Sequence, residues 1–364
     1  MKITLVAGAR PNFMKIAPVI NAIKKAVAAG KKIEYRLVHT GQHYDEKMSE
    51  SFFRELAIPE PHVNLNSGGG TQAEQTAAIM IKFEKDLMEN PADIVVVVGD
   101  VTSTMACAIV AQKLHTKVGH IEGGIRSGDW MMPEEINRLV TDSITNYFFT
   151  TSEQANDNLS KAGINKERIF FVGNTMIDTL LKQMPHLKRP KFFDSFALTE
   201  KAYFVLTLHR PANVDSGNNL SRLIVEIIKN VRDLPIIFPV HPRTKTPLAK
   251  LTLSFPNLHL VDPLGYLEFN YLVKNSKAVI TDSGGITEET TVMGIPCMTL
   301  RDTTERPETC TIGTNELLGT DPNAIKPALD KLFKGMWKQG AIPDLWDGKA
   351  AERIIESILT TYGE

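Results

Sequence analysis

Cysteine is scarce in this chain of 364 residues, which contains only Cys107, Cys297 and Cys310. The three cysteines are widely spaced and form no Cys-x-x-Cys pair. This spacing predicts reduced thiols in a cytosolic protein and gives no support to a disulfide framework or a zinc site. We therefore expect no bound metal.

Long apolar runs and a strong net charge are also missing. The N-terminal segment MKITLVAGARPNF has an apolar run of only five residues before its first glycine, which is too short for a signal peptide. No later run approaches the length of a membrane span. The net charge is -1, with 23% charged residues, so bulk electrostatics give no reason to expect a nucleic-acid or membrane partner. We expect a cytoplasmic protein.

Several motifs that identify common enzyme classes are absent. The turn that begins at Gly8 is not Gly-x-Gly-x-x-Gly, so a nicotinamide cofactor is not supported. No Walker A lysine motif is present, which argues against ATP hydrolysis. No Gly-x-Ser-x-Gly motif or paired Cys–His motif suggests nucleophilic acyl transfer. We expect no cofactor.

Two series of short β-branched runs alternate with helical patterns along the chain. At this length two domains are expected. The alternation predicts an α/β fold with two Rossmann-like, doubly wound parallel-sheet domains that face a central cleft. We place the domains at residues 1–172 and 173–349, with a C-terminal helix at 350–364 that packs back on the first. The expected strands are Ile3–Val6, Ile33–Val38, Ile94–Val98, Val118–Ile121, Tyr147–Thr150, Ile169–Val172, Tyr203–Leu208, Ile236–Val240, Leu258–Val261, Val279–Thr281 and Cys297–Leu300.

The segment Ala278–Glu308 predicts an anion site. A strand leads into Asp282-Ser283-Gly284-Gly285, and a helix follows from Ile286 to a cap at Gly294. Free N–H groups and the helix dipole would converge at such a turn. Glu289, one turn into the helix, could accept hydrogen bonds from two neighbouring hydroxyls, as on a ribose. An ordinary βα turn would have the same pattern, but the polar run 301–306 after the next strand favours a ligand site.

Three acids stand at or just beyond strand ends of the first domain. Asp100 and Glu122 follow two of the strands, and Glu135 lies in the first turn of a helix that starts at Pro133. We expect an inward stripe of Ile136, Leu139, Val140 and Ser143. Glu135 would then sit at the edge of the buried face, with a raised pKa suited to proton transfer. Each acid alone could be a turn former or could complement a helix dipole.

Basic residues also stand at or just beyond the ends of predicted strands, in both domains. Arg10 ends the first strand, and Lys15 lies one turn into the next helix. His209-Arg210 ends the first strand of the second domain, and His241 ends the next. Two histidines with adjacent arginines at matching strand ends favour an anionic ligand over purely structural roles. Neither histidine has metal-ligand spacing.

The acidic residues and the anion-binding basic residues together suggest chemistry at a sugar whose leaving group is a nucleoside diphosphate. In one form of this chemistry a glycosyltransferase moves the sugar to an acceptor. In the other, acids and a histidine remove and return protons on the sugar itself.

An ordered set of motifs, weak singly, resembles the non-hydrolysing UDP-N-acetylglucosamine 2-epimerase family, whose two-domain fold is shared with GT-B glycosyltransferases. The resemblance spans nearly the whole chain. Its motifs are Gly8–Pro18, Thr40–His43, Gly99-Asp100, Gly119–Asp129, Pro133–Arg138, Gly173–Asp178, His209–Asp215, Thr281–Glu289 and Arg301–Glu308.

The resemblance implies that UDP-GlcNAc and UDP-ManNAc interconvert by elimination of UDP to a 2-acetamidoglucal intermediate and re-addition, feeding cell-surface polysaccharide synthesis. It implies acid/base or leaving-group roles for Asp100, Glu122, Glu135 and His209. It further implies a homodimer. The UDP-binding residues would be Arg10, Lys15, His209, Ser283, Gly284, Gly285, Glu289 and Arg306, and a second substrate molecule acting as an activator would contact Gln42, Glu135, Arg210 and His241.

Two positions depart from the family pattern. Asn12 and Ala212 stand where many relatives have glutamate, which is compatible with a modified sugar substrate. The alternatives are a 2-epimerase of a related UDP-2-acetamido sugar, a hydrolysing 2-epimerase, a GT-B glycosyltransferase, or an idle UDP-sugar sensor. The sensor is disfavoured because every expected catalytic residue is present.

Overall fold

The computed structural model describes residues 1–42, 53, 55–215, 217–251 and 255–363 of the chain. His43, at the end of one family motif, lies outside the described residues. The chain forms two compact units. Unit 1 contains Met1–Lys182 and Asp344–Glu364, and unit 2 contains Gln183–Pro343.

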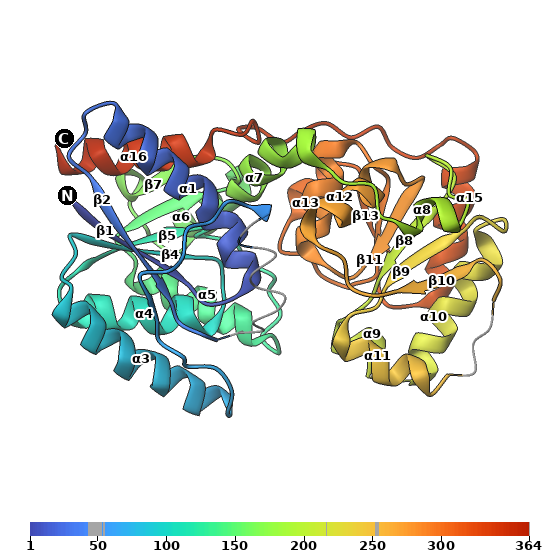
Figure 1. Cartoon of the computed structure of the whole chain (residues 1–364), viewed down its shortest axis with the longest axis horizontal. Helices are drawn as coiled ribbons and strands as arrows, with labels where there is room; N and C mark the ends of the chain where they lie inside the picture. Colours follow the sequence, from blue (N-terminus) through green and yellow to red (C-terminus); the bar gives the residue numbers. More distant parts are fainter. Residues whose placement is uncertain (43–52, 54, 216, 252–254, 364) are drawn as a thin grey trace. The chain divides into compact units, whose positions relative to one another are not determined.

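Unit 1 is built on a parallel sheet of seven strands in the order β3-β2-β1-β4-β5-β6-β7 (Figure 1). The strands are β1 (Lys2–Ala7), β2 (Glu34–His39), β3 (Val63–Asn64), β4 (Ile94–Val98), β5 (Lys117–Ile121), β6 (Tyr147–Thr150) and β7 (Ile169–Phe171). The helices are α1 (Arg10–Ala28), α3 (Gln72–Glu89), α4 (Thr102–Lys113), α5 (Pro133–Ile144), α6 (Glu153–Lys161), α7 (Thr175–Gln183) and α16 (Ala350–Tyr362).

Helices cover both faces of this sheet, so its central strand is apolar throughout. All five residues of β4 are buried, as its unbroken Ile-Val-Val-Val-Val sequence predicts. Val95 and Val97 point into a core formed with α3 and α4. On the other face α1 packs beside α16, the last helix of the chain (Figure 1).

Unit 2 repeats the plan with six parallel strands in the order β10-β9-β8-β11-β12-β13. The strands are β8 (Phe204–Thr207), β9 (Ile236–Pro239), β10 (Leu258–Val261), β11 (Ala278–Thr281), β12 (Cys297–Thr299) and β13 (Asn315–Leu317). The helices are α8 (Phe192–Ser195), α9 (Pro211–Val214), α10 (Gly217–Asn230), α11 (Pro242–Ala249), α12 (Tyr266–Asn275), α13 (Gly284–Met293), α14 (Pro307–Thr311) and α15 (Ile325–Phe333).

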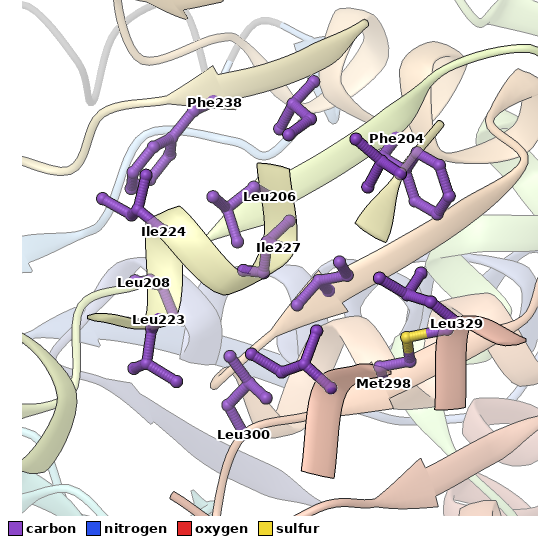
Figure 2. Packing of buried hydrophobic residues seen from close by; sticks show 14 of the residues in the cluster. Phe204, Leu206, Leu208, Leu223, Ile224, Ile227, Phe238, Met298, Leu300 and Leu329 are labelled. Atoms are coloured by element: carbon purple, nitrogen blue, oxygen red, sulfur yellow. The ribbon is translucent and has the colours of Figure 1, made fainter. Parts of the chain in front are cut away.

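Alternation along β8 divides the core of unit 2 into two layers. Phe204 and Leu206 point into a cluster with Ile224 and Ile227 of α10 and Leu329 of α15 (Figure 2). The intervening Val205 belongs to the cluster on the opposite face of the sheet. Successive side chains of a strand point to opposite faces, so a single apolar run supplies both layers.

In each sheet the order in which the chain adds strands reverses at one point. The chain runs from β1 to one edge and resumes at β4 on the other side of β1, and it does the same at β8 and β11. In doubly wound sheets ligands bind outside the carboxyl ends of the strands at such a switch point. The turns at Gly8 and Gly99 in unit 1, and at His209 and Ser283 in unit 2, lie at these ends.

The expected fold class is confirmed as two doubly wound parallel α/β sheets. The short strands β3 and β13 were not predicted. Sequence analysis placed the first domain boundary at residue 173, whereas the compact units divide after Lys182. The functional division into domains and their arrangement about a cleft stay predictions. No helix in the described ranges combines the length and apolar character needed to cross a bilayer.

Candidate active site

Asp100 is held at the end of β4 by helix α5. Gly99, with φ +69°, makes the turn in the left-handed region that glycine adopts without strain. Arg138 donates to Asp100 Oδ2 from Nε (3.1 Å) and Nη2 (2.6 Å). The neighbouring Asn137 donates from Nδ2 to the Asp100 carbonyl at 2.8 Å. Two successive residues of α5 therefore fix both the side chain and the backbone of this acid.

Glu122 lies at the end of β5 in a strained conformation. Its φ is +71°, which is uncommon for a residue with a side chain. Its N–H donates to the Phe149 carbonyl at 2.9 Å, and its buried carboxylate pairs with Lys15 Nζ at 2.8 Å. Gly124 follows, and a Cβ there would lie only 2.4 Å from the Ala155 carbonyl oxygen. The local geometry is tightly determined, as is common where strain serves a site.

The structure contradicts the prediction of which face is buried on α5, the helix that carries Glu135. The expected inward stripe is wrong, because Ile136 is 44% exposed and Ser143 is exposed, whereas Glu135 is only 3% exposed. The buried face of α5 is polar and consists of Glu135, Asn137, Arg138, Thr141 and Asp142.

The expected raised pKa of Glu135 is also wrong. Burial disfavours its charge, but the carboxylate accepts from the Ser127 N–H and hydroxyl (2.9 Å each), the Gly128 N–H (3.2 Å) and Arg138 Nη1 (2.6 Å). These hydrogen bonds outweigh burial and lower the pKa of Glu135. Glu135 is therefore an ionised carboxylate that holds the Ser127–Gly128 turn.

Arg138 joins two of the three acids. Its guanidinium, 4% exposed as a side chain, contacts both Asp100 and Glu135. A planar guanidinium suits this bridging because its donors are fixed in a fork. A buried charge of this kind is costly unless it is paired and hydrogen-bonded. Sequence analysis missed Arg138 as a site residue, although its i,i+3 spacing from Glu135 was an available signal.

The basic residues of unit 1 lie on the first turns of α1. Burial lowers the pKa of Arg10, and the charge of Glu55 partly opposes this.

Asn12 accepts from the N–H groups of Gly8 (3.1 Å) and Ala9 (3.0 Å) and donates to the Val98 carbonyl (3.1 Å). An amide both accepts and donates, whereas a carboxylate only accepts. The asparagine therefore ties the ends of β1 and β4 together.

Gln42 is anchored to the start of α4. Its Oε1 accepts from the Ser103 N–H (3.0 Å) and hydroxyl (2.7 Å). Its carbonyl is 3.4 Å from Gln75 Nε2. The structure thus places Gln42 beside the β4–α4 connection.

The predicted strand–turn–helix of unit 2 is present. Helix α13 begins at Gly284 after Ser283 and ends at Gly294, whose φ of +68° is the left-handed cap. No side-chain cap bond satisfies its first turn. Because the first N–H groups of a helix have no partner within it, this turn is suited to bind negative charge.

Two buried ion pairs lie beside this turn. Arg301 contacts Glu305 at 2.8 and 2.9 Å. Arg306 Nε donates to Glu288 Oε1 of α13 at 2.5 Å, and both side chains are buried. Arg306 was predicted as a site residue, but Glu288, its partner on the predicted anion-binding helix, was not.

Glu289 is almost fully buried. Asn270 Nδ2 donates to its Oε1 at 3.3 Å, and the Tyr266 hydroxyl also hydrogen-bonds to it. Burial dominates, and raises the pKa of Glu289 to about 7.

A buried carboxylate orients His209. Asp282, which is fully buried, contacts His209 Nδ1 at 2.8 Å. It also accepts from the His209 N–H (2.9 Å), the Arg210 N–H (2.8 Å) and Asn213 Nδ2 (3.1 Å). A carboxylate on one ring nitrogen fixes the orientation of the imidazole. Sequence analysis treated Asp282 only as a turn residue.

His241 completes the cluster. Its ring centroid lies 5.5 Å from that of His209. Its Nδ1 accepts from the Arg243 N–H at 3.2 Å, so it caps α11. Burial, followed by the charge of His209, lowers the pKa of His241. The structure brings His209, Arg210 and His241 together, and it brings Asp100, Glu122, Glu135 and Lys15 to the carboxyl end of the unit 1 sheet.

The chain's overall similarity decides its family. The family model described as UDP-N-acetylglucosamine 2-epimerase matches residues 25–359. The chain belongs to this family.

Members of the family resemble the chain over its whole length. This chain is 41% identical to the UDP-N-acetylglucosamine 2-epimerase of Methanocaldococcus jannaschii, with 100% of both chains covered. A crystal structure of the M. jannaschii UDP-GlcNAc 2-epimerase in complex with UDP-GlcNAc and UDP matches with a TM-score of 0.88, at 41% identity over 99% of this chain and 100% of that one. The UDP-2,3-diacetamido-2,3-dideoxy-D-glucuronate 2-epimerase of Pseudomonas aeruginosa is 37% identical over 98% of this chain and 99% of that protein.

Within the described residues, no group of three or more His, Cys, Asp or Glu side chains could hold a metal ion.

The raised pKa of Glu289 predicts a stability change with pH. Between its unfolded pKa near 4.5 and its folded pKa of about 7, the folded protein keeps a proton that the unfolded chain has lost. Glu289 therefore makes the free energy of unfolding larger at low pH than at high pH. This contribution is lost as the pH rises through about 7. We expect wild type to lose about 2 to 3 kcal/mol relative to Glu289→Gln between about pH 5 and about pH 8.

The measurement is denaturant unfolding of unit 2 at several pH values. Glu200→Gln, at an exposed position of unit 2, is the matched control and should keep the wild-type dependence. If the free energies of unfolding of wild type and Glu289→Gln changed with pH in parallel, Glu289 would have the same pKa in the folded and unfolded chain, and the prediction would be wrong.

Proposed function

We propose that this protein is a non-hydrolysing 2-epimerase that interconverts UDP-GlcNAc and UDP-ManNAc. The observation that carries the proposal is the set of three carboxylates, each paired with a buried cation, at the carboxyl end of the unit 1 sheet. Unit 2 contains a second set, a helix N-terminus with arginines and a carboxylate-supported histidine. Membership of the family supports the same reaction.

The chemistry of the substrate favours elimination. The proton on C2 of N-acetylglucosamine has no carbonyl beside it, so direct removal as a carbanion is costly. In the proposed route a base takes the C2 proton while the C1–O bond breaks, and its electrons leave with UDP. The product is a 2-acetamidoglucal. Re-addition of UDP to C1, with a proton delivered to the opposite face of C2, gives the epimer with all atoms balanced.

UDP binding is proposed for the basic and turn residues. Cations and oriented N–H groups stabilise a departing diphosphate, an effect usually worth several kcal/mol. Glu289 would accept from the ribose hydroxyls. The phosphate and uridine contacts are assigned to Arg10, Lys15, His209, Ser283, Gly284, Gly285 and Arg306.

The protein contacts of the three acids suggest different roles. Glu135 accepts four hydrogen bonds, so it would act as a fixed negative charge. Asp100, with its side chain 32% exposed, is open to a ligand. Glu122, beside Lys15, is the other proton-transfer candidate.

His209 is proposed to assist the leaving group. With Nδ1 directed at Asp282, its Nε2 is the ring nitrogen left for the diphosphate. An imidazolium there would offset charge that develops on the departing oxygen.

Activation by a second substrate molecule stays a proposal for Gln42, Glu135, Arg210 and His241. Arg210 Nε is buried and has no hydrogen-bond partner among the described residues, which would suit an anionic ligand. Homodimer formation and a role in cell-surface polysaccharide synthesis are likewise proposed from family resemblance.

A related UDP-2-acetamido sugar is the second candidate substrate. The 37% identical relative from P. aeruginosa is named for a diacetamido glucuronate sugar. Asn12, committed to three backbone groups, is one of the two departures from the family pattern. A substrate panel therefore belongs in the first experiment.

The first prediction is exchange of hydrogen at C2. Purified protein incubated with UDP-GlcNAc in deuterated water should place deuterium at C2 without any added acceptor, because the elimination removes that proton. The measurement is NMR or mass spectrometry of the recovered UDP-sugars. The panel repeats it with UDP-ManNAc and UDP-diacetamido uronates.

The outcomes separate the alternatives. Accumulation of free N-acetylmannosamine would select the hydrolysing enzyme, and dependence on an acceptor would select a glycosyltransferase. No C2 exchange in any sugar of the panel would reject the epimerase proposal.

The second prediction concerns Glu122→Gln. The amide cannot take part in proton transfer as a carboxylate does, so C2 exchange should fall by about 100-fold or more. UDP affinity, measured by calorimetry, should stay near wild type. Glu134→Gln, two residues into α5, is the matched control with full exchange. Wild-type exchange in Glu122→Gln would remove Glu122 from the mechanism.

A further inference from the structure

A fourth carboxylate, Asp142, lies on the buried face of α5 and has no assigned role. It is 3% exposed. Its Oδ1 lies 2.8 Å from His120 Nδ1. Its Oδ2 accepts from the Gly124 N–H at 3.0 Å and from Arg126 Nη1 at 2.6 Å.

His120 is fully buried, and both of its ring nitrogens face acceptors. Nε2 lies 2.7 Å from the Gly99 carbonyl oxygen, which can only accept, so Nε2 carries a hydrogen. Nδ1 faces Asp142, whose other oxygen is already bound by a cation and an N–H. An ionised Asp142 requires a hydrogen on Nδ1 as well. Both ring nitrogens of His120 are therefore placed to donate, one to Asp142 and one to Gly99.

Charged groups face both members of this pair. Asp142 of α5 is the carboxylate that faces the ring, and Arg126, after β5, faces the same carboxylate. The Gly99 carbonyl, directly after β4, faces Nε2 of the ring. Burial opposes ionisation of Asp142, but the hydrogen bond and charge of His120, together with Arg126, outweigh it and lower the pKa of Asp142.

The same contacts control the backbone of two candidate acids. His120 and Gly124, both bound to Asp142, stand two residues before and two residues after Glu122. Glu122 has the strained φ of +71°, which needs external support. Through Nε2, His120 also holds Gly99, the residue before Asp100.

We propose that Asp142 and His120 form a positioning device, in which His120 donates from both ring nitrogens and so fixes the turns that carry Asp100 and Glu122. Neither residue is a catalytic residue, because each acts through the backbone of another. The positioning role rests on the proposed epimerase function, whereas the protonation of His120 does not.

The first test is the protonation state of His120 in the full chain. Heteronuclear NMR of the imidazole nitrogens at about pH 8 should show both His120 nitrogens protonated. His39 is the matched buried control. Its Nδ1 accepts from the Gly41 N–H at 2.8 Å, and burial lowers its pKa to about 4, so it should be neutral at the same pH. A neutral His120 at about pH 8 would overturn the proposal.

The second test separates positioning from binding. In Asp142→Asn the rate of C2 exchange should fall on the order of 100-fold, because displacement of a reacting group by about 1 Å has effects of this size. The dissociation constant for UDP should stay near wild type. Asp157→Asn, at an exposed position of α6, is the control with full exchange.

Exchange at the wild-type rate in Asp142→Asn would overturn the positioning role, as would a loss of UDP affinity equal to the loss of exchange. If Asp142→Asn does not fold, His120→Gln is the second variant, and the same two measurements apply with the same expected and overturning results. If wild type itself shows no C2 exchange with any UDP-sugar, the epimerase proposal fails, and the NMR result still decides the protonation of His120.

Discussion

The constraint on which unit 1 depends is the cost of burying charge. A charge removed from water costs several kcal/mol unless it is paired and hydrogen-bonded. Helix α5 places Glu135, Arg138 and Asp142 on its buried face, so each needs a partner. The partners are the turns at the ends of β4 and β5, and pairing with them holds the candidate acids in place.

Unit 2 uses the same principle for a different purpose. There the buried carboxylates Asp282 and Glu288 face a histidine and an arginine beside the N-terminus of α13. The carboxylates orient these two side chains, and the helix adds its own positive end. One sheet plan thus supports the proposed anion site in unit 2 and, in unit 1, carboxylates held by paired cations.

Much of the fold follows from local sequence. Unbroken apolar runs such as Ile94–Val98 predict buried strands, and Gly294 predicts the end of α13. The strands β3 and β13, of two and three residues, are too short for any periodicity to reveal.

The buried face of α5 could not be predicted in this way. An apolar stripe is the usual sign of a buried helix face, and it pointed to Ile136. Which face is buried is set instead by partners distant in sequence, since Arg138 pairs with Asp100 across 38 residues. The candidate acids were found from their positions at strand ends, but the groups that hold them were not.

The most direct test of this account is the rate of C2 hydrogen exchange in Arg138→Lys. Lysine keeps the positive charge but lacks the fork of donors that bridges Asp100 and Glu135. If the bridge sets the positions of the acids, exchange should fall at least about tenfold while UDP affinity stays near wild type. Exchange at the wild-type rate would contradict the claim that this buried pairing organises the site.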